Sequence, residues 1–193
     1  MNKIRHMKPL IAVATGMTLC AGAFAADWSV VPETSSVGFL GTQQGTRFNG
    51  RFETFAAEID FDPNSPAAGK VVGIVQTESV NTRDHDRDSA LLDKDWFNAA
   101  EFPEARFESA SIKPAGDGSY QAAGQLTLKG QTKPAVLKFT FSPGETSSAQ
   151  PTTAQFAGSM VVNRFDFNVG EGWNDTSWVA QDVTVEIKLD LKR

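Results

Sequence analysis

The sequence predicts an all-β fold, a barrel or sandwich of eight or nine antiparallel strands interrupted by one short helix. Three observations predict this class. Apolar and polar residues alternate over several segments, as they do in strands with one buried face. Turn-forming clusters rich in Gly, Pro, Asn and Asp separate these segments. Glycines also recur inside the strand-like segments, where they mark bends. Such bends help to close a sheet into a barrel, and irregular sandwich edges are the alternative.

The first 25 residues have the pattern of a cleaved export signal. A basic start at residues 3–8 is followed by an apolar run, Pro9–Cys20, which is too short to span a bilayer. An Ala-Phe-Ala motif ends at Ala25, so we expect cleavage after Ala25, a mature domain of residues 26–193 and export across a membrane. Lipid attachment at Cys20 is disfavoured, because Leu19 stands where lipoprotein signals have a small residue.

The composition of the mature chain excludes several kinds of site. Cys20, the only cysteine, and His6, one of two histidines, lie in the signal, so disulfides, thiolate nucleophiles and Cys-based zinc sites cannot form. His85 cannot provide bis-histidine haem ligation alone, and no nucleophile elbow is present. The full chain has a formal net charge of −5. Because the signal contains basic but no acidic residues, the mature surface is more acidic still and repels nucleic acid. We expect no cofactor, metal or catalytic residue.

Strand-like segments follow one another along most of the chain. The clearest, residues 183–191, places five aliphatic side chains on one face and polar side chains on the other. Residues 137–141 repeat the pattern with phenylalanines inward. In chain order, the best-defined predicted strands are VVGIVQTESV (71–80), ARFESASI (105–112), QLTL (125–128), LKFTF (137–141), Met160–Phe165 and VTVEIKLDL (183–191).

A different periodicity in RDSALLDKDWFN, residues 87–98, predicts a short helix after the third or fourth strand, capped by Asp88 or Ser89. Aspartates at positions 84, 86 and 88 resemble the start of a calcium-binding loop. The match then ends, because Ser89 occupies the glycine position and Asp95 occupies the position of a bidentate glutamate. We therefore interpret the stretch as a solvated turn with a capped helix and local Arg–Asp pairs.

Four segments resemble the YceI-like family of bacterial exported proteins, in order and over nearly all of the mature chain. They are DWSVVPETSSVGF (27–39), RDSALLDKDWFNAAEFPEARFESASI (87–112), GQLTLKGQTKPAVLKFTF (124–141) and MVVNRFDFNVG (160–170). The resemblance implies a lipocalin-like antiparallel β-barrel of about eight strands whose interior holds a long apolar chain. Polyisoprenoids and isoprenoid quinones are the ligands associated with the family.

Two details qualify this resemblance. Many members carry a histidine and a second arginine on the helix where this chain has Ala90 and Leu92, so only Arg87 and Asp88 match that motif. The ending GEGWNDTSWVAQDVTVEIKL (170–189) is similar to a branch fused to, or encoded near, a di-haem b-type membrane cytochrome. The resemblance thus implies a quinone-linked role and a b-type cytochrome partner, by analogy only.

The candidate ligand-binding residues are large apolar side chains on the presumed inward faces. Fourteen phenylalanines and four tryptophans against one tyrosine suit a cavity for a hydrocarbon chain. A solid core is the alternative, because patterning does not distinguish a hollow barrel from a filled one. The inward candidates are Phe39, Phe48, Phe52, Ile74, Phe107, Leu126, Leu128, Phe139 and Phe165. Trp173 and Trp178 either close one mouth of the barrel or pack together at a strand end.

The leading functional hypothesis is a periplasmic carrier or sequestering protein for a long-chain isoprenoid lipid or quinone. Each buried methylene contributes ~0.8 kcal/mol, so such a chain can bind tightly without polar recognition. One alternative is an interaction module without a ligand that docks on a membrane partner such as a b-type cytochrome. The other is a carboxylate-based hydrolase, which is disfavoured because no acidic pair forms a recognisable motif.

Overall fold

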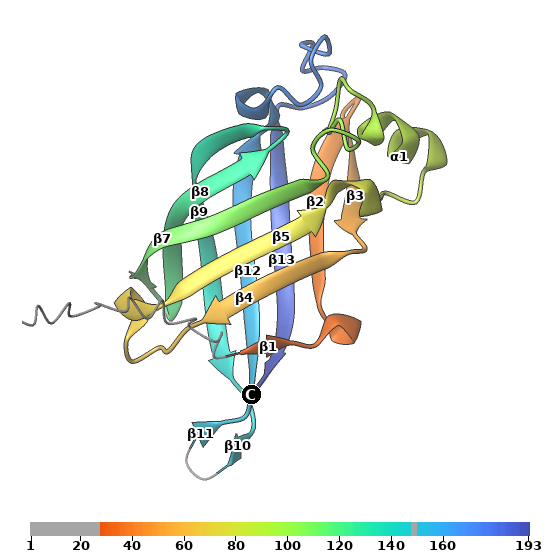
Figure 1. Cartoon of the computed structure of the whole chain (residues 1–193). Coiled ribbons are helices and arrows are strands. Elements are labelled where there is room, and N and C mark those ends of the chain that lie inside the picture. The colour runs from red at the N-terminus through yellow and green to blue at the C-terminus, as the bar shows by residue number, and fades with distance from the viewer. Residues whose placement is uncertain (1–27, 148–149) are drawn as a thin grey trace, which may run out of the picture.

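The computed structural model describes residues 28–147 and 150–193, so the predicted signal lies outside the described residues. Antiparallel strands form one large sheet that curls into a half-barrel, and a separate sheet of two short strands (Figure 1). Within the described residues, nine strands have six or more residues: β2 (Ser36–Gln43), β3 (Thr46–Phe52), β4 (Phe55–Asp60), β5 (Lys70–Gln76), β7 (Glu104–Gly116), β8 (Ser119–Leu128), β9 (Gln131–Pro143), β12 (Thr153–Asn163) and β13 (Asp182–Lys192). The predicted all-β, antiparallel class is confirmed.

Short elements complete the fold. The short strands are β1 (Ser29–Val30), β6 (Val80–Asn81), β10 (Thr146–Ser147) and β11 (Gln150–Pro151). The 3-10 turns of the described part of the chain are η1 (Pro32–Thr34), η2 (Pro66–Ala68), η3 (Thr77–Ser79) and η4 (Arg164–Phe167). The α-helix, α1 (His85–Leu92), follows the fourth long strand, as predicted. No helix in the described part of the chain has the length and apolar character needed to cross a membrane.

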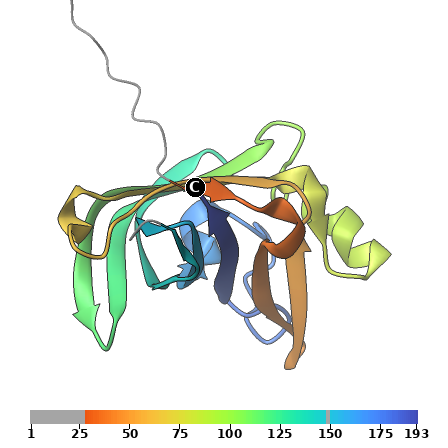
Figure 2. The same cartoon turned by 90° about the horizontal axis from the view of Figure 1, so that it is seen from below.

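The sheet has the strand order β4-β5-β7-β8-β9-β12-β13-β2-β3-β6. At one end of the curled sheet, the first described residues form a strap that connects β13 to β4, as the view from that end shows (Figure 2). There β1 pairs with β13, and the backbone N–H of Trp28 donates to the carbonyl of Ile59 on β4 at 3.1 Å. The indole N–H of Trp28 donates to the carbonyl of Phe61, also at 3.1 Å. This strap brings β4 close to the C-terminal strand.

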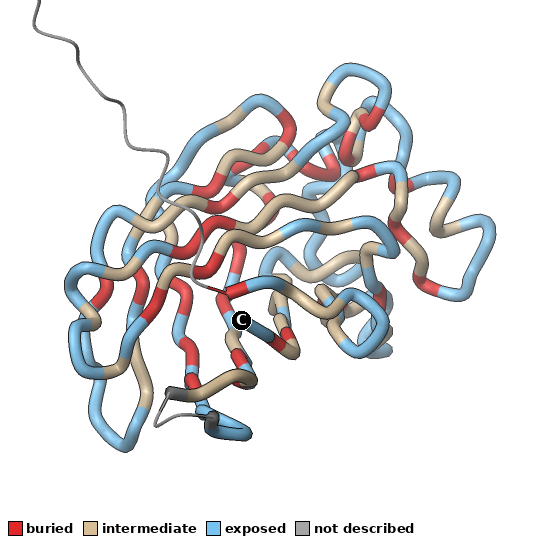
Figure 3. The backbone as a smooth tube through the Cα atoms, turned by 60° about the horizontal axis from the view of Figure 1, so that its bottom comes forward, coloured by how far each residue is buried: buried red, intermediate tan, exposed pale blue. Residues whose placement is uncertain are grey.

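Alternating burial follows from the pleat, since successive side chains of a strand point to opposite faces. Buried residues recur along the strands between exposed ones (Figure 3). The predicted inward face of β13 is confirmed, with Leu189 and Leu191 buried and the apolar residues before them packed against the core. The same holds for β9, where Leu137, Phe139 and Phe141 are buried.

The helix begins earlier than predicted, and its cap is a different residue. Asp84 is the N-cap, and its carboxylate accepts a hydrogen bond from the backbone N–H of Arg87 at 3.0 Å. Asp88 instead accepts from the backbone N–H and the hydroxyl of Thr82, at 2.7 and 2.6 Å. Arg87 also forms an ion pair with Asp84 at 3.2 Å, so the local Arg–Asp pairing is present. Within the described ranges, no three metal-ligating side chains gather as a metal site.

Candidate ligand-binding site

The concave side of the sheet encloses a cavity of about 1330 Å³, a volume that includes its opening to solvent. Strands on both sides of the curl line it, together with the segment that follows α1. The lining side chains are apolar except for those of Thr42 and Arg164. A concave, mostly apolar pocket is typical of a small-molecule or lipid site.

Seven of the predicted ligand-binding residues line this cavity. They are Phe39, Phe48, Phe52, Ile74, Phe107, Leu126 and Leu128. The first three form an aromatic wall on β2 and β3: the ring centroid of Phe39 lies 6.3 Å from that of Phe48 and 5.6 Å from that of Phe52. Phe107 and Leu126 face them from β7 and β8, where they are directly paired.

Ile74 lines the cavity, but the strand pairing places its side chain on the other face of the sheet from the one predicted. It is paired with Arg106, whereas Gly73 is paired with the cavity-lining Phe107. Directly paired residues share a face of the sheet. The Ile74 side chain therefore lies on the outer face with Arg106. The inward positions of β5 are Val71, Gly73 and Val75. A glycine inside an aliphatic run makes both registers equally plausible from the sequence.

Phe139 belongs to a solid part of the interior instead of the cavity wall. Its ring lies 5.2 Å from Phe61, 5.4 Å from Tyr120 and 4.7 Å from Phe156 between centroids. Phe61 is fully buried and Phe139 is 2% exposed. The interior is thus filled by aromatic packing at one end and hollow at the other. The two possibilities raised by the sequence, a hollow barrel and a solid core, each describe one end of the interior.

Truncating this packed part should destabilise the protein without removing the cavity. We expect Phe139→Ala to lower the free energy of unfolding by about 3–5 kcal/mol, because the lost ring leaves a void among buried rings. Chemical denaturation measures this change. Because Phe139 does not line the cavity, retention of an apolar ligand by the folded variant should match the wild type. A stability within about 1 kcal/mol of the wild type would contradict this account of the packing.

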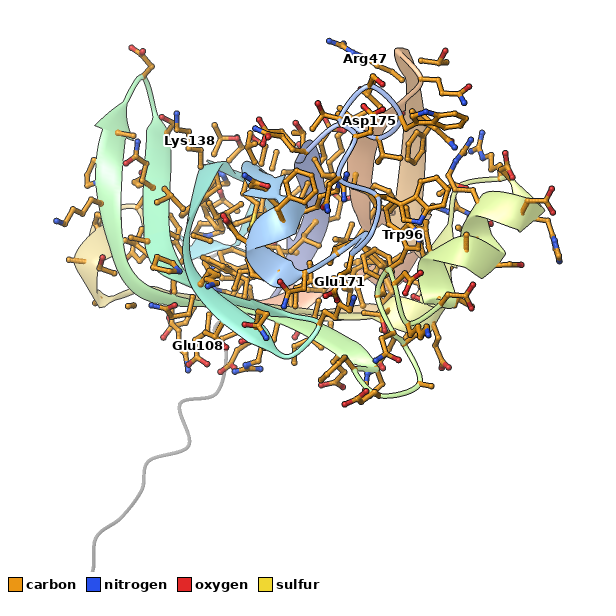
Figure 4. All side chains as sticks on the ribbon, turned by 90° about the horizontal axis from the view of Figure 1, so that it is seen from above. Arg47, Trp96, Glu108, Lys138, Glu171 and Asp175 are labelled. Carbon is orange, nitrogen blue, oxygen red and sulfur yellow. The ribbon has the colours of Figure 1, made fainter. Side chains whose placement is uncertain are left out.

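A second hollow forms the mouth of the cavity. It is lined by Gln43, Phe48, Asp84, Asp86, Arg87, Ala90, Leu91, Trp96, Trp173 and Val179, and we call this set the mouth. Phe48, Leu91, Trp96 and Val179 line both spaces. The mouth therefore lies between α1, the β2–β3 hairpin and the segment before β13. In the view from above, Trp96, Glu171 and Asp175 lie at this end (Figure 4).

The remaining sequence-predicted residues lie at or outside the mouth. Trp173 lines the mouth, is 46% exposed and packs 6.3 Å from Trp96 between ring centroids. Trp178 is 49% exposed and lines neither hollow, although its carbonyl accepts from the backbone N–H of Gln44 at 2.8 Å. Phe165 is part of η4 and does not line the cavity; the Arg164 guanidinium lies 4.1 Å above its ring. Of the two predicted arrangements, a pair that closes the mouth or a pair that packs together, the structure places Trp173 at the mouth, where its ring packs against Trp96.

Arg164 is the principal site residue that the sequence analysis missed. It is 2% exposed, and its guanidinium donates hydrogen bonds to the carbonyls of Val169, Gly170, Trp173, Val179 and Ala180. These bonds use all five N–H donors of the side chain. Burial lowers the pKa of Arg164 from its ordinary value. Arg164 therefore holds residues 169–180 along one side of the cavity opening.

A buried lysine supports the same side of the cavity opening, residues 169–180, which we call the rim. Lys129 is 8% exposed, and its ammonium donates to the carbonyls of Asp95 and Asn168 at 3.2 and 2.7 Å. The backbone N–H groups of Gly170 and Glu171 also donate to the Asp95 carbonyl, at 2.7 and 2.9 Å. Cation-to-carbonyl bonds thus join the segment after α1 to the segment after η4. The sequence carries no signal that distinguishes Lys129 and Arg164 from exposed basic residues such as Lys138.

The domain model of the YceI-like family matches residues 28–191. The chain belongs to the YceI-like family. A UPF0312 protein of Pseudomonas syringae pv. tomato is 32% identical over 184 residues, which cover 93% of this chain and 96% of that protein. A UPF0312 protein of Yersinia pestis (strain Pestoides F) is 34% identical over 141 residues, covering 73% and 71% of the two chains.

Solved structures show the same architecture as this YceI-like protein. Burkholderia cenocepacia BcnA superposes with a TM-score of 0.77 at 31% identity, covering 84% of this chain and 99% of BcnA. A polyisoprenoid binding domain from Saccharophagus degradans, implicated in plant cell wall breakdown, has a TM-score of 0.63 at 16% identity, covering 86% and 97%. At that identity the second comparison shows the fold alone.

Two of the segments that resemble the YceI-like family lie at the cavity opening. MVVNRFDFNVG contains Arg164, which organises the rim. The helix motif contains Arg87 at the mouth and Asp88, which ties the start of α1 to Thr82. These two segments therefore place Arg164 and Arg87 at the cavity entrance.

Proposed function

We propose that this YceI-like protein binds, and so carries or sequesters, a long-chain isoprenoid lipid or isoprenoid quinone in the periplasm. The observation that carries the proposal is an apolar cavity on the concave side of the sheet with a defined mouth. Shared fold with a polyisoprenoid binding domain supports this ligand class. Hydrocarbon burial at ~0.8 kcal/mol per methylene supplies affinity without a polar motif. The predicted signal sequence is the reason for proposing the periplasm.

The proposed protein is a binding protein and not an enzyme. Its cavity lining, taken over the described residues, includes no carboxylate, histidine, thiol or lysine. General acid–base chemistry requires such a titratable group within reach of the substrate. The guanidinium of Arg164 is the charged group of the lining, and its donors are already occupied by backbone carbonyls. The lining suits retention of a hydrocarbon more than its conversion.

Native mass spectrometry tests the proposal directly. Residues 26–193, expressed with their signal and purified from the periplasm without detergent, should carry a one-to-one adduct. Solvent extraction should release a lipid whose mass fits a polyprenyl chain or an isoprenoid quinone. A protein that is free of lipid and also fails to take up added quinone or polyprenol would overturn the proposal. That result would favour a docking module for a membrane partner such as a b-type cytochrome.

A further inference from the structure

The cavity lining has few polar groups that could distinguish one ligand from another by hydrogen bonds. The lining offers the Thr42 hydroxyl and the Arg164 guanidinium, and the latter already makes five hydrogen bonds to carbonyls. The polar side chains that a ligand meets lie at the mouth instead. Since Phe48, Leu91, Trp96 and Val179 are shared by the cavity and the mouth, a tail in the cavity places its headgroup there.

Arg87 is the preorganised donor of the mouth. Its Nε donates to Oε1 of Gln43 at 3.2 Å, and its Nη2 lies 3.2 Å from Oδ2 of Asp84. The guanidinium is stacked 4.2 Å above the ring of Phe48, and the side chain is 24% exposed. Three contacts therefore fix the plane of the group. Among the described residues, Nη1 has no hydrogen-bond partner, so it can donate to a ligand.

The charge of the mouth disfavours an anionic ligand. Asp84 and Asp86 are its acidic residues and Arg87 is its basic one. The backbone N–H of Arg87, and then its guanidinium, lower the pKa of Asp84, so this carboxylate is ionised at neutral pH. Glu171 and Asp175 add exposed carboxylates at the same end of the molecule, where Arg47 adds one exposed guanidinium, so acidic groups still outnumber basic ones (Figure 4). A phosphate placed here would meet like charges that Arg87, already paired with Asp84, does not offset.

We propose that Arg87, Gln43 and Asp84 form a headgroup site at the mouth, which accepts an uncharged hydrogen-bond acceptor and disfavours a phosphate. The inference rests on the proposed function, because it assumes that an isoprenoid tail occupies the cavity. An oxygen of a ring carbonyl or an alcohol accepts from Nη1 of Arg87, and a ring headgroup can pack against the exposed face of Trp173. Asp84 thus both orients the donor and rejects competing anions, a combination typical of specific sites.

A competition among ligands with one common tail tests this site. The ligands are geranylgeraniol, geranylgeranyl phosphate, a benzoquinone with a geranylgeranyl tail and the corresponding tetraprenyl hydrocarbon, supplied at equal concentrations and counted by native mass spectrometry. The wild type should take up the quinone and the alcohol at least about tenfold over the phosphate, because like-charge juxtaposition carries a penalty of that order or more.

Two variants separate the parts of the site. Asp84→Asn with Asp86→Asn removes two charges and keeps the helix cap, since asparagine caps as well as aspartate. Uptake of the phosphate relative to the alcohol should then rise about tenfold. Arg87→Met should lower the preference for the quinone over the hydrocarbon by about tenfold, because a charged donor is lost. Asp117→Asn with Glu33→Gln is the matched control, with the same charge change at exposed positions outside the mouth.

The outcomes are distinct. Equal uptake of phosphate and alcohol by the wild type, or an Asp84/Asp86 variant indistinguishable from the control, would overturn the headgroup site while leaving the carrier function intact. Failure of all four ligands to bind, the bare hydrocarbon included, would overturn the proposed function and the headgroup site together.

Discussion

A Gly73→Leu variant is expected to fold normally and to lose most of its ligand. Gly73 lies in the middle of β5, paired with Phe107 on one side and Ala57 on the other, both of which line the cavity. A Cβ atom at this position would meet no heavy atom within 4 Å. The new side chain would therefore project into the cavity without displacing its walls.

The size of this effect follows from the volume that leucine takes. Its four side-chain carbons displace about four carbons of ligand, which at ~0.8 kcal/mol each is ~3 kcal/mol, or about a hundredfold in Kd. Stability of the ligand-free protein should be unchanged or slightly raised, because glycine inside a strand is unfavourable. Extracted lipid per mole of protein and thermal unfolding after delipidation measure the two effects separately.

A matched control is available on the outer face of the sheet, which points away from the cavity. Ala123 lies on β8, is exposed and is paired with Ser111 and Val136 on the outer face. Ala123→Leu adds a leucine to a strand without entering the cavity, so it should retain lipid at the wild-type level. Full lipid content in Gly73→Leu would show that the ligand does not occupy this part of the cavity.

An Arg164→Met variant is expected to lose both stability and ligand retention. Methionine keeps much of the buried hydrocarbon but leaves the five carbonyls of residues 169–180 without their donor. Removing one side of such a buried charged network lowers the free energy of unfolding by about 3–5 kcal/mol. Hydrogen exchange of the backbone amides should rise within residues 169–180, since this segment depends on the guanidinium for its geometry.

The readouts for Arg164 distinguish loss of the rim from a general loss of stability. Arg164→Lys keeps a positive charge but supplies three donors in place of a planar set of five, so it should recover only part of the protection. Arg106→Met is the control, because Arg106 forms an exposed ion pair with Glu108 and such pairs are worth about 0–1 kcal/mol. Wild-type exchange in residues 169–180 of Arg164→Met would contradict the assigned role.

The helix and the strands show how far local pattern extends. The alternation in residues 183–191 and 137–141 predicted two strands and their buried faces, because period-two burial is a local consequence of the pleat. The existence of α1 was also predicted. Its start was not, since both Asp84 and Asp88 are good caps, and the choice depends on Thr82, which engages Asp88. The predicted inward face of β5 differs from the observed one for a similar reason. A valine-rich run with a central glycine has no strong preference for either face.

The sequence by itself determined the class of fold, the order of its strands along the chain and the family to which the chain belongs. These depend on short-range periodicity and on motifs that are contiguous in the chain. Only the tertiary structure decided that Phe107 faces a cavity while Phe139 lies in a packed core, although both are inward phenylalanines on neighbouring parts of one sheet. Hollow and solid regions differ in the distance across the curled sheet and in what faces each ring from the other side. The same is true of Arg164, whose five carbonyl partners converge only when the chain after η4 folds back over the opening.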